Sequence, residues 1–184
     1  MKKIILCGMM GSGKTTVANI LRNKYGYKCV DTDERIVQKY GSINDIFHRH
    51  GEKRFRDIES KVTVRVANSR HNYVISLGGG CVLRPSNVEA LKRVGTIFYL
   101  RTSPKIIVSR LEGDTSRPLL HGNLEERVKS ITATRSSVYE TVADVIIDTD
   151  DLNPEQIAKI IVNNVEGQFK NENCVNYRRN KGNR

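Results

Sequence analysis

The chain of 184 residues contains no tryptophan, only four prolines and only four cysteines. The cysteines, Cys7, Cys29, Cys81 and Cys174, form no CxxC pair, so neither a zinc site nor a disulfide framework is indicated. No apolar run approaches the roughly eighteen residues that a membrane-spanning helix needs, and no secretory signal stands at the N-terminus. We therefore expect reduced thiols, a cytoplasmic location and no membrane partner.

The length suffices for one well-packed domain. We expect this domain to span residues 1–166, because the last eighteen residues are rich in asparagine and basic residues and poor in apolar ones. Residues 167–184 are predicted to form a basic, disordered tail.

The formal net charge of +11 raises the question of a nucleic-acid partner. From Gly167 onward five Lys/Arg residues oppose one acid, which gives +4 and leaves +7 for the rest. The remaining arginines are scattered and form no lysine-rich stripe with interleaved aromatic residues, so small anionic ligands explain them better and no nucleic acid is expected. In the alternative, a nucleotide-dependent protein would bind nucleic acid through its tail and lose this salt-dependent binding when cut at Gly167.

Short apolar runs alternate along the chain with segments of helical periodicity. Strands are expected at residues 4–7, 27–30, 73–77, 96–100 and 144–147. Helices are expected at residues 17–25, 34–40, 43–48, 52–68, after Pro85, at 104–111, 124–139 and after Pro154. This alternation predicts an α/β fold whose parallel sheet is covered on both faces and whose ligands bind at the carboxyl ends of the strands.

The most specific motif is Gly8-Met-Met-Gly-Ser-Gly-Lys14-Thr15, which follows a predicted strand and opens a predicted helix. Its glycines let successive backbone N–H groups point at one spot, and the helix dipole adds positive potential there. Lys14 supplies a point charge for the outer phosphates, and the Thr15 hydroxyl is placed to ligate the accompanying magnesium. The motif predicts a nucleotide phosphate site formed by Gly11, Ser12, Gly13, Lys14, Thr15 and Thr16.

Two acids, Asp31 and Asp33, stand at the end of the second predicted strand. In an extended segment, residues i and i+2 share a face, so both carboxylates can point towards the phosphate loop. One could hold magnesium through water while the other accepts a proton from a substrate hydroxyl. The alternative is a strand-ending turn in which Asp33 caps the next helix.

Two further motifs suit an anionic, hydroxylated ligand. Arg56 and Glu59 are neighbours on one face of a predicted helix, where the carboxylate can fix the guanidinium for bidentate contact with an anion; the alternative is a surface ion pair. The run Gly78-Gly79-Gly80 ends a strand and leaves the backbone bare for close approach of a ligand.

Residues 112–122 combine Gly113 and small polar residues with Arg117. They predict a mobile lid that excludes water and brings Arg117 over the transferring phosphoryl group, although a loop arginine taken alone usually faces solvent. Arg135 follows on a later predicted helix.

In their order and spacing these motifs resemble those of the shikimate kinase family, small P-loop kinases of the nucleoside-monophosphate-kinase structural family. The resemblance runs from Lys3 to about Val165 and leaves out only the tail. It is carried by Gly8–Thr15, Asp31-Thr32-Asp33, Phe55-Arg56-Asp57-Ile58-Glu59, Gly78-Gly79-Gly80, Arg117-Pro118 and Arg135 with Tyr139.

The resemblance implies a three-layer α/β fold with a five-stranded parallel sheet of order 2-3-1-4-5. It also implies substrate-binding helices at about 33–61, a lid at about 112–122, and a monomer that transfers the γ-phosphoryl group of ATP to the 3-hydroxyl of shikimate. That reaction belongs to aromatic amino-acid biosynthesis and uses Mg²⁺.

Individual roles follow from the matching positions. Asp33 matches the proposed base, Arg56 and Arg135 match the residues that grip the shikimate carboxylate, and Gly79 and Gly80 match backbone contacts to the substrate. Glu59 matches a residue that orients the arginines.

On the nucleotide side, Thr15 matches a direct magnesium ligand and Asp31 a water-mediated one. Lys14 and the lid residue Arg117 match the groups that neutralise charge during transfer, and Arg110 and Pro154 match positions that sandwich the adenine. The acids at residues 148–151 depart from the family, because many relatives carry a basic residue near adenine there.

The nearest alternative is another small-molecule P-loop kinase, such as a gluconate or nucleoside-monophosphate kinase. Such enzymes are not expected to combine Gly78-Gly79-Gly80 with Arg56 and Arg135. A non-catalytic relative is disfavoured because Lys14, Asp33, Arg56, Arg117 and Arg135 are all present. Cys81 is interpreted as a structural thiol rather than a substrate contact.

Overall fold

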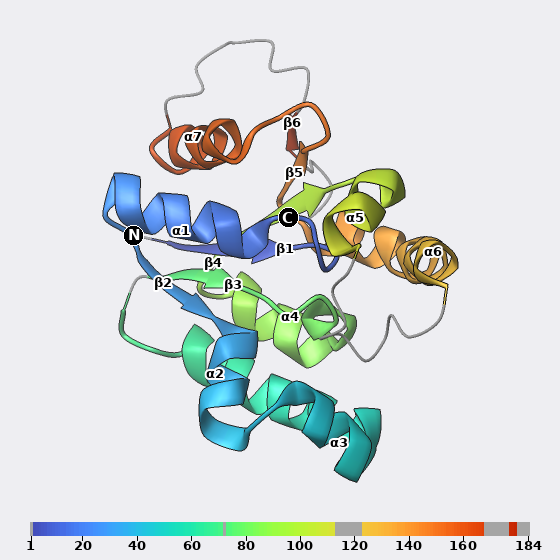
Figure 1. The fold of residues 1–184 in the computed structure, drawn as a ribbon. Helices are drawn as coiled ribbons and strands as arrows, with labels where there is room; N and C mark the ends of the chain where they lie inside the picture. The colour runs from blue at the N-terminus through green and yellow to red at the C-terminus, as the bar shows by residue number, and fades with distance from the viewer. Residues whose placement is uncertain (1, 72, 113–122, 168–176, 180–184) are drawn as a thin grey trace.

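A twisted sheet lies between two layers of helices in the computed structural model, which describes residues 2–71, 73–112, 123–167 and 177–179 (Figure 1). The elements in chain order are β1 (Lys3–Cys7), α1 (Lys14–Tyr25), β2 (Lys28–Asp31), α2 (Thr32–Tyr40), α3 (Ile43–Ala67), β3 (Tyr73–Ser76), the 3-10 helix η1 (Cys81–Leu83), α4 (Pro85–Lys92), β4 (Gly95–Arg101), α5 (Pro104–Leu111), α6 (Leu124–Val142), β5 (Val145–Asp148), α7 (Pro154–Val165) and β6 (Tyr177–Arg179).

The strand order is β2-β3-β1-β4-β5-β6, and the first five strands are parallel. This confirms the predicted order 2-3-1-4-5. Strand β1 is central, pairing Ile5 with Ile75 on one side and with Ile97 on the other. All five of its residues are buried, as expected for a parallel strand covered on both faces.

The sixth strand corrects one prediction about the tail, which was expected to be disordered from 167 to 184. Residues Tyr177–Arg179 pair antiparallel with β5, with Ile146 opposite Arg178. Strand β5 would otherwise present an edge of unpaired backbone groups, and a short extended segment satisfies them. Residues 168–176 and 180–184 of the tail lie outside the described part of the chain.

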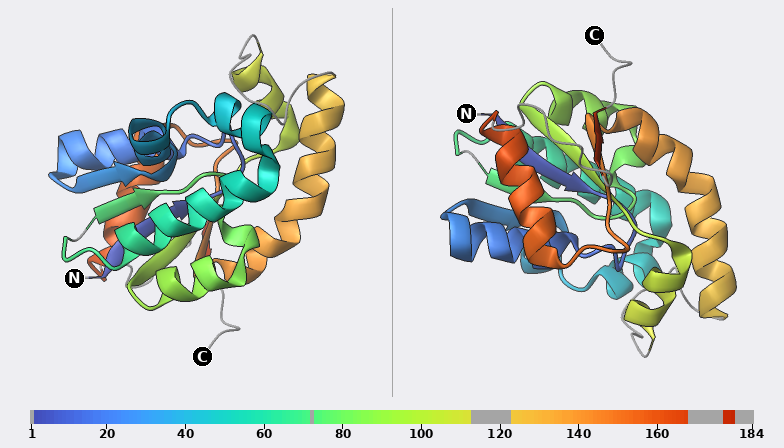
Figure 2. Two further views of the ribbon diagram at one scale, coloured as in Figure 1. Left: turned by 90° about the horizontal axis from the view of Figure 1, so that it is seen from below. Right: turned by 90° about the horizontal axis from the view of Figure 1, so that it is seen from above.

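Two apolar clusters hold the helices to the sheet. On one face, Ile5, Ile75 and Ile97 pack against helices α4, α5 and α6 and the end of α3. On the other face, Leu6 and Phe98 pack against α1 and α7. Figure 2 shows α3, α4 and α6 in the view from below and α1 with α7 in the view from above. A third, smaller cluster joins α2 to α3.

Helix α3 covers the two helices that were predicted at residues 43–48 and 52–68, and it contains a break between them. Gly51 lies inside it with φ 74° and ψ 173°, a backbone conformation that residues with a Cβ rarely adopt. The segment up to His50 therefore leaves the axis of the segment that begins at Glu52, and the latter carries Arg56 and Glu59.

The strand order indicates where a ligand would bind. Because β1 lies between β3 and β4, the loop after β1 stands at the point where the connections turn to opposite sides, which is where open α/β sheets bind ligands. The carboxyl ends of β2 and β3 lie at the same edge and bring Asp31 and Gly78 beside that loop.

Candidate active site

The loop from Gly8 to Lys14 curls around its own lysine. Lys14 is only 8% exposed, and its Nζ donates hydrogen bonds to the carbonyl oxygens of Gly8 (2.9 Å) and Met9 (2.8 Å). Gly8, Gly11 and Gly13 have φ of 141°, 78° and 91°, which glycine adopts without strain. Helix α1 then begins at Lys14 and directs its positive end at the loop.

Three oxygen-bearing side chains converge beside this loop. The hydroxyls of Thr15 (2.9 Å) and Ser76 (2.8 Å) both donate to Oδ2 of Asp31. Sequence reasoning found Thr15 and Asp31 but missed Ser76, whose only signal was its position at the carboxyl end of β3. Hard oxygen donors of this kind suit Mg²⁺, which usually takes one or two protein ligands and completes its shell with phosphate and water.

Asp31 and Asp33 do not share an extended strand, which corrects the premise from which both were predicted. Helix α2 begins already at Thr32, and Asp31 is its N-cap: Oδ1 of Asp31 accepts from the backbone N–H of Asp33 (2.9 Å) and of Glu34 (3.4 Å). The alternative in which Asp33 is the cap is therefore wrong as well. Both carboxylates nonetheless line the cleft at the phosphate loop, because the first helical turn directs Asp33 back towards it.

The phosphate loop opens into a first cavity of about 460 Å³. Its lining includes Arg110, Leu152 and Pro154, and Nη1 of Arg110 donates to the carbonyl oxygen of Gly11 (3.1 Å). The neighbouring acids are engaged elsewhere, because Asp148 pairs with Arg101 and Asp150 accepts from the backbone N–H of Ser103 (2.9 Å).

A second cavity of about 400 Å³ lies between α2, α3 and the glycine run after β3. It shares Met10, Asp33 and Gly79 with the first cavity, so the two meet at these residues. Its lining also includes apolar side chains that sequence reasoning did not assign to the site, namely Val37, Ile43 and Phe47.

Two arginines line the second cavity. Arg56 and Arg135 are each 9% exposed, although they lie far apart in the sequence, on α3 and α6. Nη1 of Arg56 donates to Oε2 of Glu59 (2.8 Å), so the predicted pairing is confirmed, but the pair is buried rather than on the surface. Nη1 of Arg135 is buried and makes no hydrogen bond to a residue that the structure describes.

Burial and the neighbouring charges act on the pKa values of Arg56 and Glu59. Burial disfavours the guanidinium of Arg56, but the carboxylates of Glu59 and Glu52 outweigh burial and raise its pKa. Burial also raises the pKa of Glu59, against the opposing charges of Arg56 and Arg135. The cavity therefore offers two guanidinium groups, of which that of Arg56 is held by the buried carboxylate of Glu59, a suitable arrangement for an anionic ligand.

The three glycines make room for these side chains. A Cβ at Gly78 would lie 2.5 Å from Oδ1 of Asp33 and 2.8 Å from Oε1 of Glu59, and one at Gly80 would overlap the guanidinium of Arg56. A Cβ at Gly79 would lie 3.4 Å from the backbone nitrogen of Met10. The glycine run is therefore needed for close packing of the site side chains and not only for an exposed backbone.

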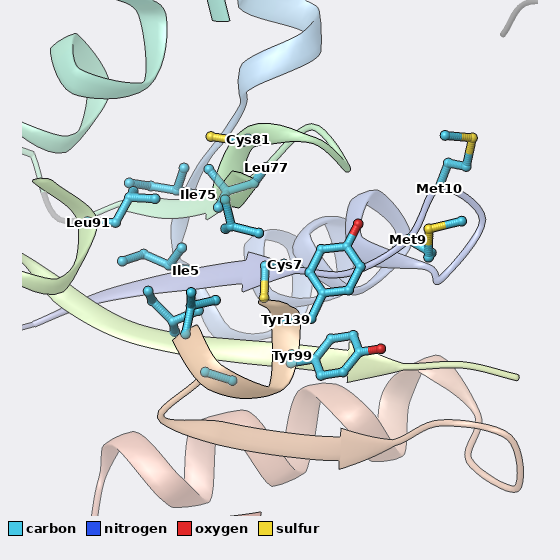
Figure 3. Packing of buried hydrophobic residues seen from close by; sticks show 14 of the residues in the cluster. Ile5, Cys7, Met9, Met10, Ile75, Leu77, Cys81, Leu91, Tyr99 and Tyr139 are labelled. Atoms are coloured by element: carbon cyan, nitrogen blue, oxygen red, sulfur yellow. The ribbon is translucent and has the colours of Figure 1, made fainter. Parts of the chain in front are cut away.

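Tyr139 supports the glycine run from beneath, donating a hydrogen bond to the carbonyl oxygen of Gly79. Its ring stacks on that of Tyr99 with centroids 5.0 Å apart, and Figure 3 shows the two rings together below the loop that carries Met9 and Met10. Burial raises the pKa of Tyr139 to about 12, so its phenol remains a donor at neutral pH.

Some residues singled out in the sequence lie outside the two cavities or outside the described part of the chain. Arg117 and most of the predicted lid, residues 113–122, lie outside the described part of the chain. Cys81 is fully buried and in contact with Thr63, where burial raises the pKa of its thiol, and it does not line either cavity. The interpretation of Cys81 as a structural thiol is therefore confirmed.

Comparison with known proteins identifies the family of the chain. A family model described as shikimate kinase matches residues 10–166. The chain belongs to the shikimate kinase family. It is 44% identical over 168 residues to the shikimate kinase of Thermodesulfovibrio yellowstonii, an alignment that covers 90% of this chain and 96% of that protein. It is 41% identical over 164 residues to the enzyme of Caldicellulosiruptor bescii, with 88% and 94% covered.

A solved structure of the shikimate kinase of Acinetobacter baumannii in complex with shikimate is also similar. The two chains superpose with a TM-score of 0.87 at 32% identity, covering 93% of this chain and 96% of that one. In the described residues no helix is both long and apolar enough to cross a membrane.

Proposed function

We propose that the chain transfers the γ-phosphoryl group of ATP to the 3-hydroxyl of shikimate, with Mg²⁺ as the accompanying metal. The observation that carries this proposal is the meeting of two cavities at Asp33 and Gly79. One contains a phosphate loop, and the other contains two buried arginines. The arrangement suits a reaction between a nucleotide and a small carboxylated acceptor.

The second cavity fits the chemistry of shikimate, which has one carboxylate and several hydroxyls on a ring. Arg56 and Arg135 would hold the carboxylate, because guanidinium groups match it in charge and shape. The backbone at Gly79 and Gly80 would accept close approach of the ring. Apolar side chains such as Phe47 and Val37 would cover its faces.

Asp33 would act as the base. It lies where the cavities meet, so a hydroxyl held there would face both this carboxylate and the phosphate loop. Accepting the hydroxyl proton as the bond to phosphorus forms is a contribution that an aspartate can make at neutral pH.

Lys14 and the residues around Asp31 would serve the nucleotide. Phosphate oxygens would replace the carbonyls that Lys14 contacts in the structure, and Gly11, Ser12, Gly13 and Thr16 would contribute loop contacts. Thr15 and Asp31 would hold Mg²⁺, the former directly and the latter through water; the metal, when bound, neutralises phosphate charge. Arg110 and Pro154 would enclose the adenine.

Two elements of the proposal rest on sequence. Arg117 would close over the phosphates from a lid at about residues 112–122, and residues 1–166 would form the catalytic domain, to whose sheet Tyr177–Arg179 add an edge strand. A cytoplasmic location is supported by the free thiols of Cys7, Cys29 and Cys81, which suit a reducing compartment. We expect a monomer acting on small molecules only.

The planar guanidinium group of Arg56 provides a test of how the substrate is recognised. Arg56→Lys keeps the positive charge but loses the planar pair of donors, so the KM for shikimate should rise by about tenfold or more. The KM for ATP should stay within about twofold, because Arg56 does not line the nucleotide cavity. Steady-state kinetics with each substrate varied in turn measure both values.

Arg93→Lys is the matched control, since Arg93, at the C-terminal end of α4, also pairs with a glutamate four residues before it but lines neither cavity. An Arg56→Lys enzyme with weakened ATP binding and unchanged shikimate binding would show that the roles of the cavities are assigned wrongly.

A further inference from the structure

Arg56 has a second acidic partner, Glu52, which neither the motif nor the proposed reaction uses. Oε1 of Glu52 accepts hydrogen bonds from both Nε (3.2 Å) and Nη2 (3.0 Å) of Arg56. With Nη1 bound to Glu59, every nitrogen of this guanidinium already donates to an acid. The edge formed by Nε and Nη2 is one of the two edges on which a guanidinium grips a carboxylate bidentately.

The two acids differ in how firmly they are held. The side chain of Glu59 is 1% exposed, whereas that of Glu52 is 53% exposed. Glu52 does not line the second cavity and therefore reaches Arg56 from the solvent side. An exposed carboxylate loses little when it leaves its partner for water, while a buried one loses much. Of the two, Glu52 is the group that can be released.

Release of Glu52 changes the formal charge around Arg56 and Arg135. Around the guanidinium groups, Arg56, Arg135, Glu59 and Glu52 are two cations and two anions, so the formal charges of this set cancel in the free protein; the further acid of the cavity, Asp33, lies at its junction with the nucleotide cavity. A substrate carboxylate entering this neutral set would be the third carboxylate around two guanidinium groups. Once Glu52 turns into solvent, the remaining three side chains have a formal charge of +1, which attracts the carboxylate.

The position of Glu52 in α3 allows its carboxylate to leave Arg56 and enter solvent. Glu52 follows Gly51, where α3 breaks with φ 74°, and its own side chain is already 53% exposed to solvent. Glu52 therefore stands in the first turn after the break, where an acid is favoured by the unpaired backbone N–H groups and by the helix dipole. A released carboxylate keeps a favourable environment there.

We propose that Glu52 is an internal counter-carboxylate: it neutralises Arg56 in the free protein, gives way to the carboxylate of the substrate, and thereby sets the affinity for shikimate. This inference rests on the proposed function, because it assumes that the ligand of Arg56 is the shikimate carboxylate. It makes Glu52 a determinant of affinity without direct contact with the substrate.

The test is the Glu52→Gln variant, which keeps the shape of the side chain and removes its charge. The dissociation constant and KM for shikimate should fall by about three- to fivefold, the effect of removing one exposed ionic competitor, while kcat and the KM for ATP change by less than about twofold. Titration calorimetry without nucleotide measures binding alone. Glu125→Gln is the control, because the side chain of Glu125 is also more than half exposed and pairs with Lys129 at the same helical spacing.

A second ligand separates competition from a general effect on the site. The methyl ester of shikimate has no anionic group, so its affinity should be the same in the wild-type and Glu52→Gln proteins. Unchanged or weakened shikimate binding by Glu52→Gln would overturn the inference and make Glu52 a residue that positions Arg56. An equal gain for the ester would also overturn it. A wild-type protein that neither binds nor phosphorylates shikimate would instead refute the proposed function, and the inference with it.

Discussion

Replacing Lys14 with alanine is expected to lower kcat by about two orders of magnitude or more. The charge that develops on the phosphate oxygens during transfer would lose its closest protein cation, since Lys14 lies inside the phosphate loop and only 8% of it is exposed. Steady-state release of ADP with saturating shikimate measures this loss.

The structure adds a second consequence for this variant. Lys14 also ties the loop together through the carbonyl oxygens of Gly8 and Met9, so its loss should lower the free energy of unfolding by about 1–3 kcal/mol. That is less than the about 5–15 kcal/mol by which domains are stable, and the protein should remain folded. Lys159→Ala, on the exposed face of α7, serves as control. Near-normal turnover by a folded Lys14→Ala protein would contradict the phosphate-loop assignment.

Asp33→Asn is expected to lower kcat by about a hundredfold or more and to leave the KM for ATP nearly unchanged. The amide keeps the size of the side chain but cannot take up the hydroxyl proton. Asp33 lies at the junction of the cavities, within a site so closely packed that a Cβ on Gly78 would come within 2.5 Å of it.

Glu34→Gln provides a matched control for this experiment. Both acids stand in the first turn of α2 and interact similarly with its dipole, but Glu34 is exposed and lines neither cavity. If Glu34→Gln lost as much activity as Asp33→Asn, the cause would be the helix terminus and not proton transfer. An Asp33→Asn enzyme with more than about half of the wild-type kcat would remove Asp33 from the role of base.

Much of the fold could be predicted because the local patterns agree with one another. The continuous apolar run of β1, the phosphate loop and the glycine at the end of α1 together specify a strand, a turn and a helix. The strand order, by contrast, came from the resemblance to a family. Alternation of strands and helices alone predicts a parallel sheet without its order.

The prediction that Asp31 and Asp33 both face the phosphate loop is confirmed, but the local structure predicted for them was wrong. An aspartate in the sequence can end a strand or begin a helix, and only the accepted hydrogen bonds show that Asp31 is the cap. The period-2 argument was therefore applied to the first turn of a helix. Both carboxylates still line the nucleotide cavity, because that turn lies at the end of β2.

Other parts of the site depend on tertiary contacts that no local pattern contains. Ser76 is an ordinary strand residue until β3 lies beside β2, where its hydroxyl meets Asp31. The glycine run was predicted to leave backbone bare, but its packing against Arg56 and Glu59 requires the position of α3. The strand at Tyr177–Arg179 was missed because pairing at a sheet edge does not need an apolar sequence.

The central claim is that this site phosphorylates shikimate rather than another small acceptor, and a single panel tests it most directly. ADP release from Mg²⁺-ATP is measured by a coupled assay with shikimate, quinate, gluconate or AMP as acceptor. We expect kcat/KM with shikimate to exceed each of the others by about a hundredfold or more, because only shikimate matches the arginines, Asp33 and the ring-shaped space together. Faster turnover of gluconate or AMP than of shikimate would contradict the account.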